Sequence, residues 1–359
     1  MSITAPAAEP SAASASALET LNFTRCPSVP TASALAYQLG YLQQEFADEP
    51  GYTTVLKSIG FTGKTEYAHA ERLWIRNAGH APAVWAHALG VDSKVVALAW
   101  LEGSYPVVTL AGSGIASPAD LRGKRVGVIG RVGQSFDLMI AQQLKIYTTA
   151  LGTAGLGLSD VQRVDIPAPP YDSEPRPNGL KADHFLEQAR VLAAALVRGE
   201  VDAVITRLPQ AVAEFLGVRT IYDTHDHPDP RARVHPSVLR GLVVSGALLA
   251  ERRDIVVRYL VRLLQAAEWA LAQPQRAVEL IAADFKVAPE ALSSAYDDVA
   301  AGIQIDLDAD KVASLEAQKD FLLAHGFIAR DFELAPWVDA GPLAEARQLY
   351  AERKARGEL

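Results

Sequence analysis

Short runs of apolar and β-branched residues alternate along most of the chain with longer stretches whose apolar residues recur at helical spacing. The predicted strands are Leu21–Arg25, Lys94–Trp100, Val107–Leu110, Arg125–Ile129, Ala203–Thr206 and Leu242–Ser245. The predicted helices are Thr31–Phe46, Pro82–Leu89, Gln134–Leu151, His184–Arg198 and Pro209–Leu216. This alternation is typical of α/β proteins, in which helices cover parallel sheets. Ligands of open α/β sheets bind outside the carboxyl ends of strands, so strand-to-helix turns are the places to search.

The last third of the chain differs from the rest, because from Glu251 onward the pattern is helical almost throughout. Turns are expected near Gln273-Pro274, Ala288-Pro289 and Gly302. A chain of 359 residues is too long for one compact core, so we expect two lobes. The first lobe takes residues 19–112 and 209–359, the second takes residues 113–208, and residues 1–18 form a disordered leader. The Pro-rich stretch Pro167–Gly179 is predicted to be an exposed loop of the second lobe.

Composition and charge exclude several classes of function. Apolar residues make up 49% of the chain and charged residues 21%, with a net charge of −8. No run of Lys and Arg rises above that acidic background, which argues against nucleic acid and acidic membranes as partners. No stretch approaches the roughly 18 apolar residues of a membrane span. The protein is expected to bind a small molecule.

The start of the chain and its cysteine content indicate a cytoplasmic protein. Residues 1–17 are rich in Ala, Ser and Pro and have neither the basic nor the apolar region of a signal peptide. The single cysteine, Cys26, permits no intrachain disulfide, which fits a reducing compartment.

Two motifs in the middle of the chain carry a resemblance to a known superfamily. Ile115–Gly130 reads IASPADLRGKRVGVIG, and Leu196–Ile205 reads LVRGEVDAVI. Together they resemble the second lobe of the nitrate/sulfonate/taurine solute-binding-protein superfamily. The resemblance implies a type II periplasmic-binding-protein-like α/β fold, with a cleft between two lobes and, here, a helical C-terminal extension.

The amino-terminal part resembles one enzymatic branch of that superfamily, the aromatic sulfinate desulfinases. The similar segments are Phe23–Leu42 and Glu66–Gly90. The signature of the branch is a Cys after the first strand, a His ten residues before an Arg, and R-x-G-G at that Arg. The resemblance implies that Cys26 is the nucleophile, that Arg76 binds the substrate and that the Gly79 backbone donates to the sulfinate. It implies no cofactor and no metal.

This chain departs from the signature at two positions. The first glycine of R-x-G-G is replaced by Ala78, and the histidine position is occupied by Glu66. His69 stands three residues after Glu66 and would share a face with it in a local helix. In that arrangement His69 accepts the thiol proton and Glu66 orients the ring. The alternative is a solvated glutamate and a loop histidine. His80 is a second candidate for the imidazole.

Cys26 has an environment that suits a nucleophile even without the resemblance. It follows an apolar strand and precedes Pro27 and Pro30, after which Thr31 can cap a helix. A thiol in such a turn faces the positive end of the helix dipole, which favours the thiolate. The alternative is that Cys26 is a small buried hydrophobic residue, the commonest fate of a free cysteine.

Arg76 lies in the apolar run Trp74–Gly79, which ends in small residues before the helix that Pro82 opens. A guanidinium there can hold two oxygens of a sulfinate, sulfonate or carboxylate, while backbone groups near Asn77 and Gly79 complete an anion site. The alternative is a surface arginine, as expected of Arg72.

The second lobe offers weaker candidates. Gly130–Ser135 joins a strand to a helix, where backbone N–H groups and the side chains of Gln134 and Ser135 can bind an anion. A common glycine turn is the alternative. Arg207 follows the strand Ala203–Thr206 and is placed to line the cleft. The histidines at 225, 227 and 235 lie among turn residues and are expected in an exposed loop rather than at a metal.

These patterns predict a monomeric, cofactor-free hydrolase that releases sulfite from a small, anionic, aromatic sulfinate. A different class of function stays open, namely a non-exported solute-binding or sensory protein in which Cys26 only packs. The replacement of the histidine by Glu66 is the feature that favours this alternative. A third option is another enzyme on the same fold, such as a decarboxylase.

Overall fold

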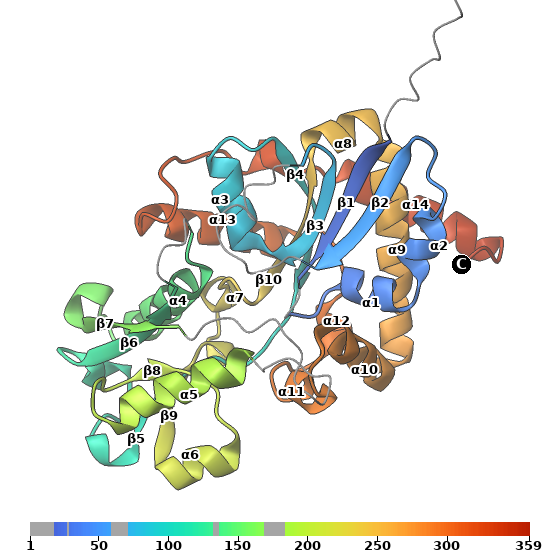
Figure 1. Cartoon of the computed structure of the whole chain (residues 1–359). Helices are drawn as coiled ribbons and strands as arrows, with labels where there is room; N and C mark the ends of the chain where they lie inside the picture. Colours follow the sequence, from blue (N-terminus) through green and yellow to red (C-terminus); the bar gives the residue numbers. More distant parts are fainter. Residues whose placement is uncertain (1–17, 27–28, 59–70, 132–135, 169–183) are drawn as a thin grey trace, which may run out of the picture.

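The computed structural model describes residues 18–26, 29–58, 71–131, 136–168 and 184–359, which form two lobes (Figure 1). The larger lobe is built on a five-stranded sheet of order β2-β1-β3-β10-β4. Its strands are β1 (Glu19–Arg25), β2 (Tyr52–Ser58), β3 (Trp74–Gly79), β4 (Ser93–Trp100) and β10 (Leu239–Ser245). β1 is parallel to β2 and β3, whereas β10 is antiparallel to both β3 and β4. β3 and β10 are buried over their whole length, as expected of central strands.

Helices cover both faces of this sheet. They are α1 (Ala32–Gln38), α2 (Tyr41–Phe46), α3 (His80–Ala88), α8 (Gly246–Glu251), α9 (Arg253–Ala272), α10 (Pro274–Phe285), α11 (Pro289–Ser293), α12 (Val299–Gly302), α13 (Ala309–Ala324) and α14 (Gly341–Ala355). One apolar core lies between the sheet and α1, α9 and α10. A second core lies under α3 and α13 and continues into the smaller lobe. None of the described helices is long and apolar enough to cross a membrane.

The smaller lobe holds two short sheets. β5 (Pro106–Leu110) pairs antiparallel with β8 (Val204–Ile205) and β9 (Val218–Asp223), while β6 (Arg125–Gly130) pairs parallel with β7 (Gln162–Pro167). Its helices are α4 (Leu138–Gly152), α5 (His184–Val197), α6 (Gln210–Leu216) and α7 (Pro230–Arg233). Because β5 and β9 pair with each other, the smaller lobe extends beyond the predicted range 113–208. We therefore propose that the chain crosses between lobes at residues 101–105 and 234–238.

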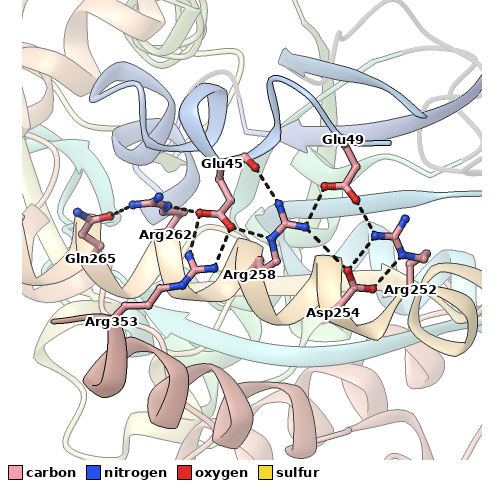
Figure 2. A network of polar contacts seen from close by, with 8 residues as sticks. All are labelled: Glu45, Glu49, Arg252, Asp254, Arg258, Arg262, Gln265 and Arg353. Atoms are coloured by element: carbon pink, nitrogen blue, oxygen red, sulfur yellow. Dashed lines mark hydrogen bonds and ion pairs between the residues drawn. The ribbon is translucent and has the colours of Figure 1, made fainter. Parts of the chain in front are cut away.

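An ion-pair network ties α2 to α9 and α14 on the outside of the larger lobe (Figure 2). The buried carboxylate of Glu45 accepts hydrogen bonds from Arg258, Arg262 and Arg353 at 2.7 to 3.2 Å. Glu49, one helical turn on, accepts from Arg252 and Arg258. Glu45 on α2 thus joins α9 to α14, and Glu49, three residues beyond the end of α2, adds a second link to α9.

Every predicted strand is present within a few residues, and so is the helical end of the chain with its turns at Gln273-Pro274, Ala288-Pro289 and Gly302. The helix predicted over Thr31–Phe46 is two helices, because Gly40 adopts a left-handed backbone with φ of 78° between α1 and α2. The expectation of parallel sheets is confirmed for β1 with β2 and β3 and for β6 with β7, but β10 and the sheet of β5 run antiparallel. Residues 1–17 and most of the predicted loop Pro167–Gly179 lie outside the described residues.

Candidate active site

The carboxyl ends of β1 and β3 lie side by side and face the smaller lobe (Figure 1). The parallel register pairs Thr24 with Arg76, and the N–H of Cys26 donates to the carbonyl oxygen of Asn77 at 3.0 Å. The register therefore continues beyond β1 and puts Cys26 opposite Ala78. The backbone of Cys26 therefore lies at the end of β3, two residues beyond Arg76.

Cys26 is only 8% exposed and packs at the end of the core of the larger lobe, beside Val29 and Ala78. Burial raises the pKa of the Tyr296 hydroxyl most, and the neighbouring Tyr105 and Cys26 raise it further. The low exposure fits a packed hydrophobic residue as well as a thiol that meets its ligand in a site shielded from water. Position at the strand end, rather than exposure, is what makes Cys26 a candidate.

Arg76 is buried, so the alternative of a surface arginine is wrong for this residue. Its Nη1 atom donates to the carbonyl oxygen of Gly79 at 2.9 Å. The guanidinium therefore extends along β3 to the level of Ala78 and Gly79, which is the level of Cys26 on the next strand. Arg72, by contrast, is 49% exposed and pairs with Glu19 and Glu251 at the surface, as predicted.

Gly79 has a second neighbour that the sequence did not identify, namely Arg240. The two residues are directly paired between β3 and β10. A Cβ atom at position 79 would lie 3.2 Å from Nη1 of Arg240 and 3.0 Å from the carbonyl oxygen of Pro236. Arg240 is buried and donates to the carbonyl oxygens of Pro236 and Ser237. The lack of a side chain at Gly79 thus lets a second buried guanidinium approach the strand end.

His80 follows Gly79 as the first residue of α3 and is fully buried. Its Nδ1–H donates to the carbonyl oxygen of Leu239 at 2.9 Å, so Nε2 carries the free electron pair. Burial lowers the pKa of His80 to about 4. The positive charges of Arg240 and Arg76 lower it further, whereas the hydrogen bond to Leu239 opposes the shift. The ring is neutral at pH 7 and is a weak base.

Two further candidates make contacts within the protein. The amide oxygen of Asn77 accepts a hydrogen bond from Ser33 of α1 at 3.1 Å, and Asn77 faces away from Arg76 in the strand. Arg207 donates to the carbonyl oxygen of Ala295 at 2.5 Å and lies over the ring of Tyr105. Arg207 therefore joins the smaller lobe to the larger one. Ligand binding by either residue stays a prediction.

Four predicted site residues, Glu66, His69, Gln134 and Ser135, lie outside the described residues, and their roles stay predictions. The expectation of an exposed loop is wrong for His235, which is buried against Tyr105. His225 lies 3.4 Å from a carboxylate oxygen of Asp297 and 3.7 Å from one of Glu102. Within the described ranges, no three His, Cys, Asp or Glu side chains are grouped to hold a metal.

No family model matches the chain, but single proteins do. It is 26% identical over 347 residues to 2'-hydroxybiphenyl-2-sulfinate desulfinase of Rhodococcus erythropolis, covering 89% of this chain and 91% of the relative. The protein of the same description from Rhodococcus qingshengii matches equally. The chain is homologous to a sulfinate desulfinase. This agrees with the resemblance found at Cys26 and Arg76.

Solved structures confirm the predicted type II periplasmic-binding-protein-like fold. The crystal structure of the desulfurization enzyme DSZB matches with a TM-score of 0.70 and 24% identity, covering 92% of this chain and 99% of that one. A cysteine-to-serine variant of that enzyme, in complex with biphenyl-2-sulfinic acid, matches with the same TM-score at 22% identity. The periplasmic aliphatic sulphonate binding protein SsuA of Escherichia coli matches with a TM-score of 0.61 at 17% identity, covering 89% of this chain and 92% of that one.

Proposed function

We propose that the protein hydrolyses the carbon–sulfur bond of a sulfinate, with Cys26 as the reacting group and Arg76 with the Gly79 amide as the holder of the sulfinate oxygens. One observation carries the proposal: Cys26 and Arg76 come from the adjoining carboxyl ends of two parallel strands. Homology to a sulfinate desulfinase supports the choice of reaction.

The reaction adds one water to the substrate: R–SO₂⁻ + H₂O gives R–H + HSO₃⁻. A planar guanidinium can donate two parallel N–H groups to the two sulfinate oxygens. This pair of hydrogen bonds fixes the anion and sets the orientation of its carbon–sulfur bond. Because Arg76 is buried, its charge is weakly screened and acts strongly on the bound anion. Arg76 thereby positions the sulfinate next to the thiol.

Two routes lead to the same products. In the first, the Cys26 thiolate attacks sulfur, the C–S bond breaks and the carbon takes a proton; water then cleaves the Cys–S–SO₂⁻ adduct to sulfite and the free thiol. In the second, the Cys26 thiol protonates the ring carbon as SO₂ departs, and water converts SO₂ to sulfite. His69, oriented by Glu66, would move the thiol proton in either route.

Gln134, Ser135 and Arg207 would contact the ligand from the smaller lobe as the lobes close and exclude water.

The alternative is a solute-binding or sensory protein without catalysis. It is favoured by the glutamate at position 66, where the desulfinase signature has histidine, and by the low exposure of Cys26. In that case Arg76 holds a sulfonate or sulfinate and Cys26 packs. The aromatic nature of the ligand, the cytoplasmic location and the monomeric state stay predictions in both cases.

The proposal is tested by incubating the purified protein with benzenesulfinate, biphenyl-2-sulfinate and methanesulfinate and measuring sulfite. Arg76→Ala should lower kcat/KM by about 100-fold, because two charge-assisted hydrogen bonds are lost. Arg72→Ala is the matched control, since Arg72 is an exposed arginine four residues away, and it should behave as wild type. Binding of a sulfinate without any sulfite release would establish the alternative instead.

A further inference from the structure

Four buried side chains have polar atoms with no hydrogen-bond partner among the described residues. They are the hydroxyls of Tyr105 and Tyr296, Nε2 of His235 and Nε of Arg240. These residues are 6%, 4%, 1% and 2% exposed, respectively. Buried polar atoms are nearly always paired in folded proteins, so four unpaired ones in one place call for an explanation.

The four side chains lie together, although they come from three segments. The rings of Tyr105 and His235 are in edge contact with centroids 4.4 Å apart. The guanidinium of Arg207 lies 4.6 Å from the ring centre of Tyr105 and 5.7 Å from that of Tyr296. Arg240 is held by the carbonyl oxygens of Pro236 and Ser237, directly after His235. The charges of Arg207 and Arg240 both act on Tyr296, which places all of these groups around one point.

The cluster offers mainly hydrogen-bond donors. Nδ1 of His235 accepts the N–H of Ser237 at 3.2 Å, so the ring proton is on Nε2. Burial, and then the charge of Arg240, lowers the pKa of His235, which keeps the ring neutral. Nε of Arg240 can only donate, and each tyrosine hydroxyl carries one proton to donate. Such a set matches an acceptor with several lone pairs.

The cluster also carries positive charge that the described residues do not balance. Arg240 bonds only to backbone carbonyl oxygens and forms no ion pair with any described carboxylate. The nearby carboxylates have other partners: Asp223 accepts from Ser104 and from the N–H of Tyr105, and Glu102 accepts from Trp100. A buried guanidinium without a carboxylate is costly unless an anion binds to it.

We propose, resting on the function above, that Tyr105, His235, Arg240 and Tyr296 bind a second anionic group of the ligand, of carboxylate type. The substrate would then be a sulfinate that also carries a carboxylate. Gly79 connects the two anion sites, because the carbonyl of Gly79 holds Arg76 while its missing side chain admits Arg240. The sulfinate lies at Arg76 and Cys26, and the carboxylate lies at Arg240 and Tyr296.

The test compares benzenesulfinate with its 2-, 3- and 4-carboxy derivatives. In the wild-type protein, at least one carboxylated isomer should exceed benzenesulfinate in kcat/KM for sulfite release by about tenfold or more. Arg240→Met and Tyr296→Phe should remove most of this preference and leave kcat/KM for benzenesulfinate within a few-fold. Tyr222→Phe is the matched control, because Tyr222 in β9 also has an unpaired buried hydroxyl but lies outside the cluster.

A purely structural role predicts a different set of results. If the Tyr296 hydroxyl binds a ligand, Tyr296→Phe should keep or raise the Tm of the ligand-free protein, because an unpaired buried hydroxyl costs stability. A lowered Tm together with an unchanged carboxylate preference overturns the proposal, even if Arg240→Met does not fold.

Failure of the proposed function is distinguishable from failure of this inference. If no sulfinate yields sulfite, the catalytic proposal is wrong. The second site is then judged by calorimetric affinity for the same four compounds. Equal affinity for all four overturns it, whereas a carboxylate preference lost in Tyr296→Phe supports it.

Discussion

The Nη1 atom of Arg76 lies 2.9 Å from the carbonyl oxygen of Gly79, three residues farther along the same strand. The acceptor is a backbone oxygen at the end of β3, so this bond brings the guanidinium toward the strand end rather than straight out from the sheet. Cys26 directly follows the neighbouring strand β1 and lies beside this end of β3. The backbone of β3 thereby determines where an anion would meet the thiol.

Gly79→Ala should impair the site without unfolding the protein. The added Cβ would lie 3.0 Å from the carbonyl oxygen of Pro236 and 3.2 Å from Nη1 of Arg240, so Arg240 or the segment before β10 must shift. The backbone φ of Gly79 is −52°, which alanine adopts freely, so the effect comes from contact and not from strain. We expect kcat/KM for a carboxylated sulfinate to fall about tenfold or more, with a loss of about 1–3 kcal/mol in unfolding free energy. Gly112→Ala, with nothing within 4 Å of the added atom, is the control.

Glu45→Gln should destabilise the larger lobe. It leaves Arg258, Arg262 and Arg353 without the carboxylate that they share (Figure 2). Breaking a buried ion pair costs about 3–5 kcal/mol, and partial exposure of the arginines lowers our expectation to about 2–4 kcal/mol in urea unfolding. Glu268→Gln, which removes an exposed pair with Lys354, should change stability by less than about 0.5 kcal/mol. Equal effects of the two variants would show that the network adds no stability.

Acid should unfold the protein partly through His80. Its pKa is about 4 in the folded state against an ordinary value of 6.5, so the unfolded state binds more protons between these values. Stability is therefore fully present above about pH 6.5 and falls as the pH is lowered toward 4, by up to about 1.4 kcal/mol per pH unit for this group. His80→Asn keeps a donor for Leu239 and should make the pH dependence of the urea-unfolding midpoint less steep between pH 6.5 and 4.5, while His235, whose pKa burial also lowers, sustains part of it. A slope that stays as steep in His80→Asn as in the wild type would assign it to other groups.

The sequence predicted the strands that are continuous in apolar residues and missed those that are not. β2, β7 and β9 have polar residues at many positions, so their pattern resembles a loop. In β3 the pattern is broken by Arg76 and Asn77, which are buried because they serve the strand end and the contact to Ser33. The strand β3 was therefore not predicted, because two of its residues are polar candidates for the functional site.

The candidate site was only partly accessible from the sequence. Cys26 and Arg76 were found because each follows or lies in an apolar segment and because both match a family signature. Arg240 and Tyr296 were missed, because their roles depend on packing between segments far apart in the chain. A signal for Arg240 did exist: it is a charged residue in the otherwise apolar run Leu239–Ser245.

The central claim is that Cys26 reacts while Arg76 holds the anion, and the most direct test separates binding from turnover in Cys26→Ser. Calorimetry should give this variant an affinity for a sulfinate within a few-fold of wild type, while sulfite release falls to the uncatalysed rate. Sulfite and the arene R–H should form in equal amounts in the wild-type protein. Release of sulfite by Cys26→Ser at the wild-type rate would contradict the account.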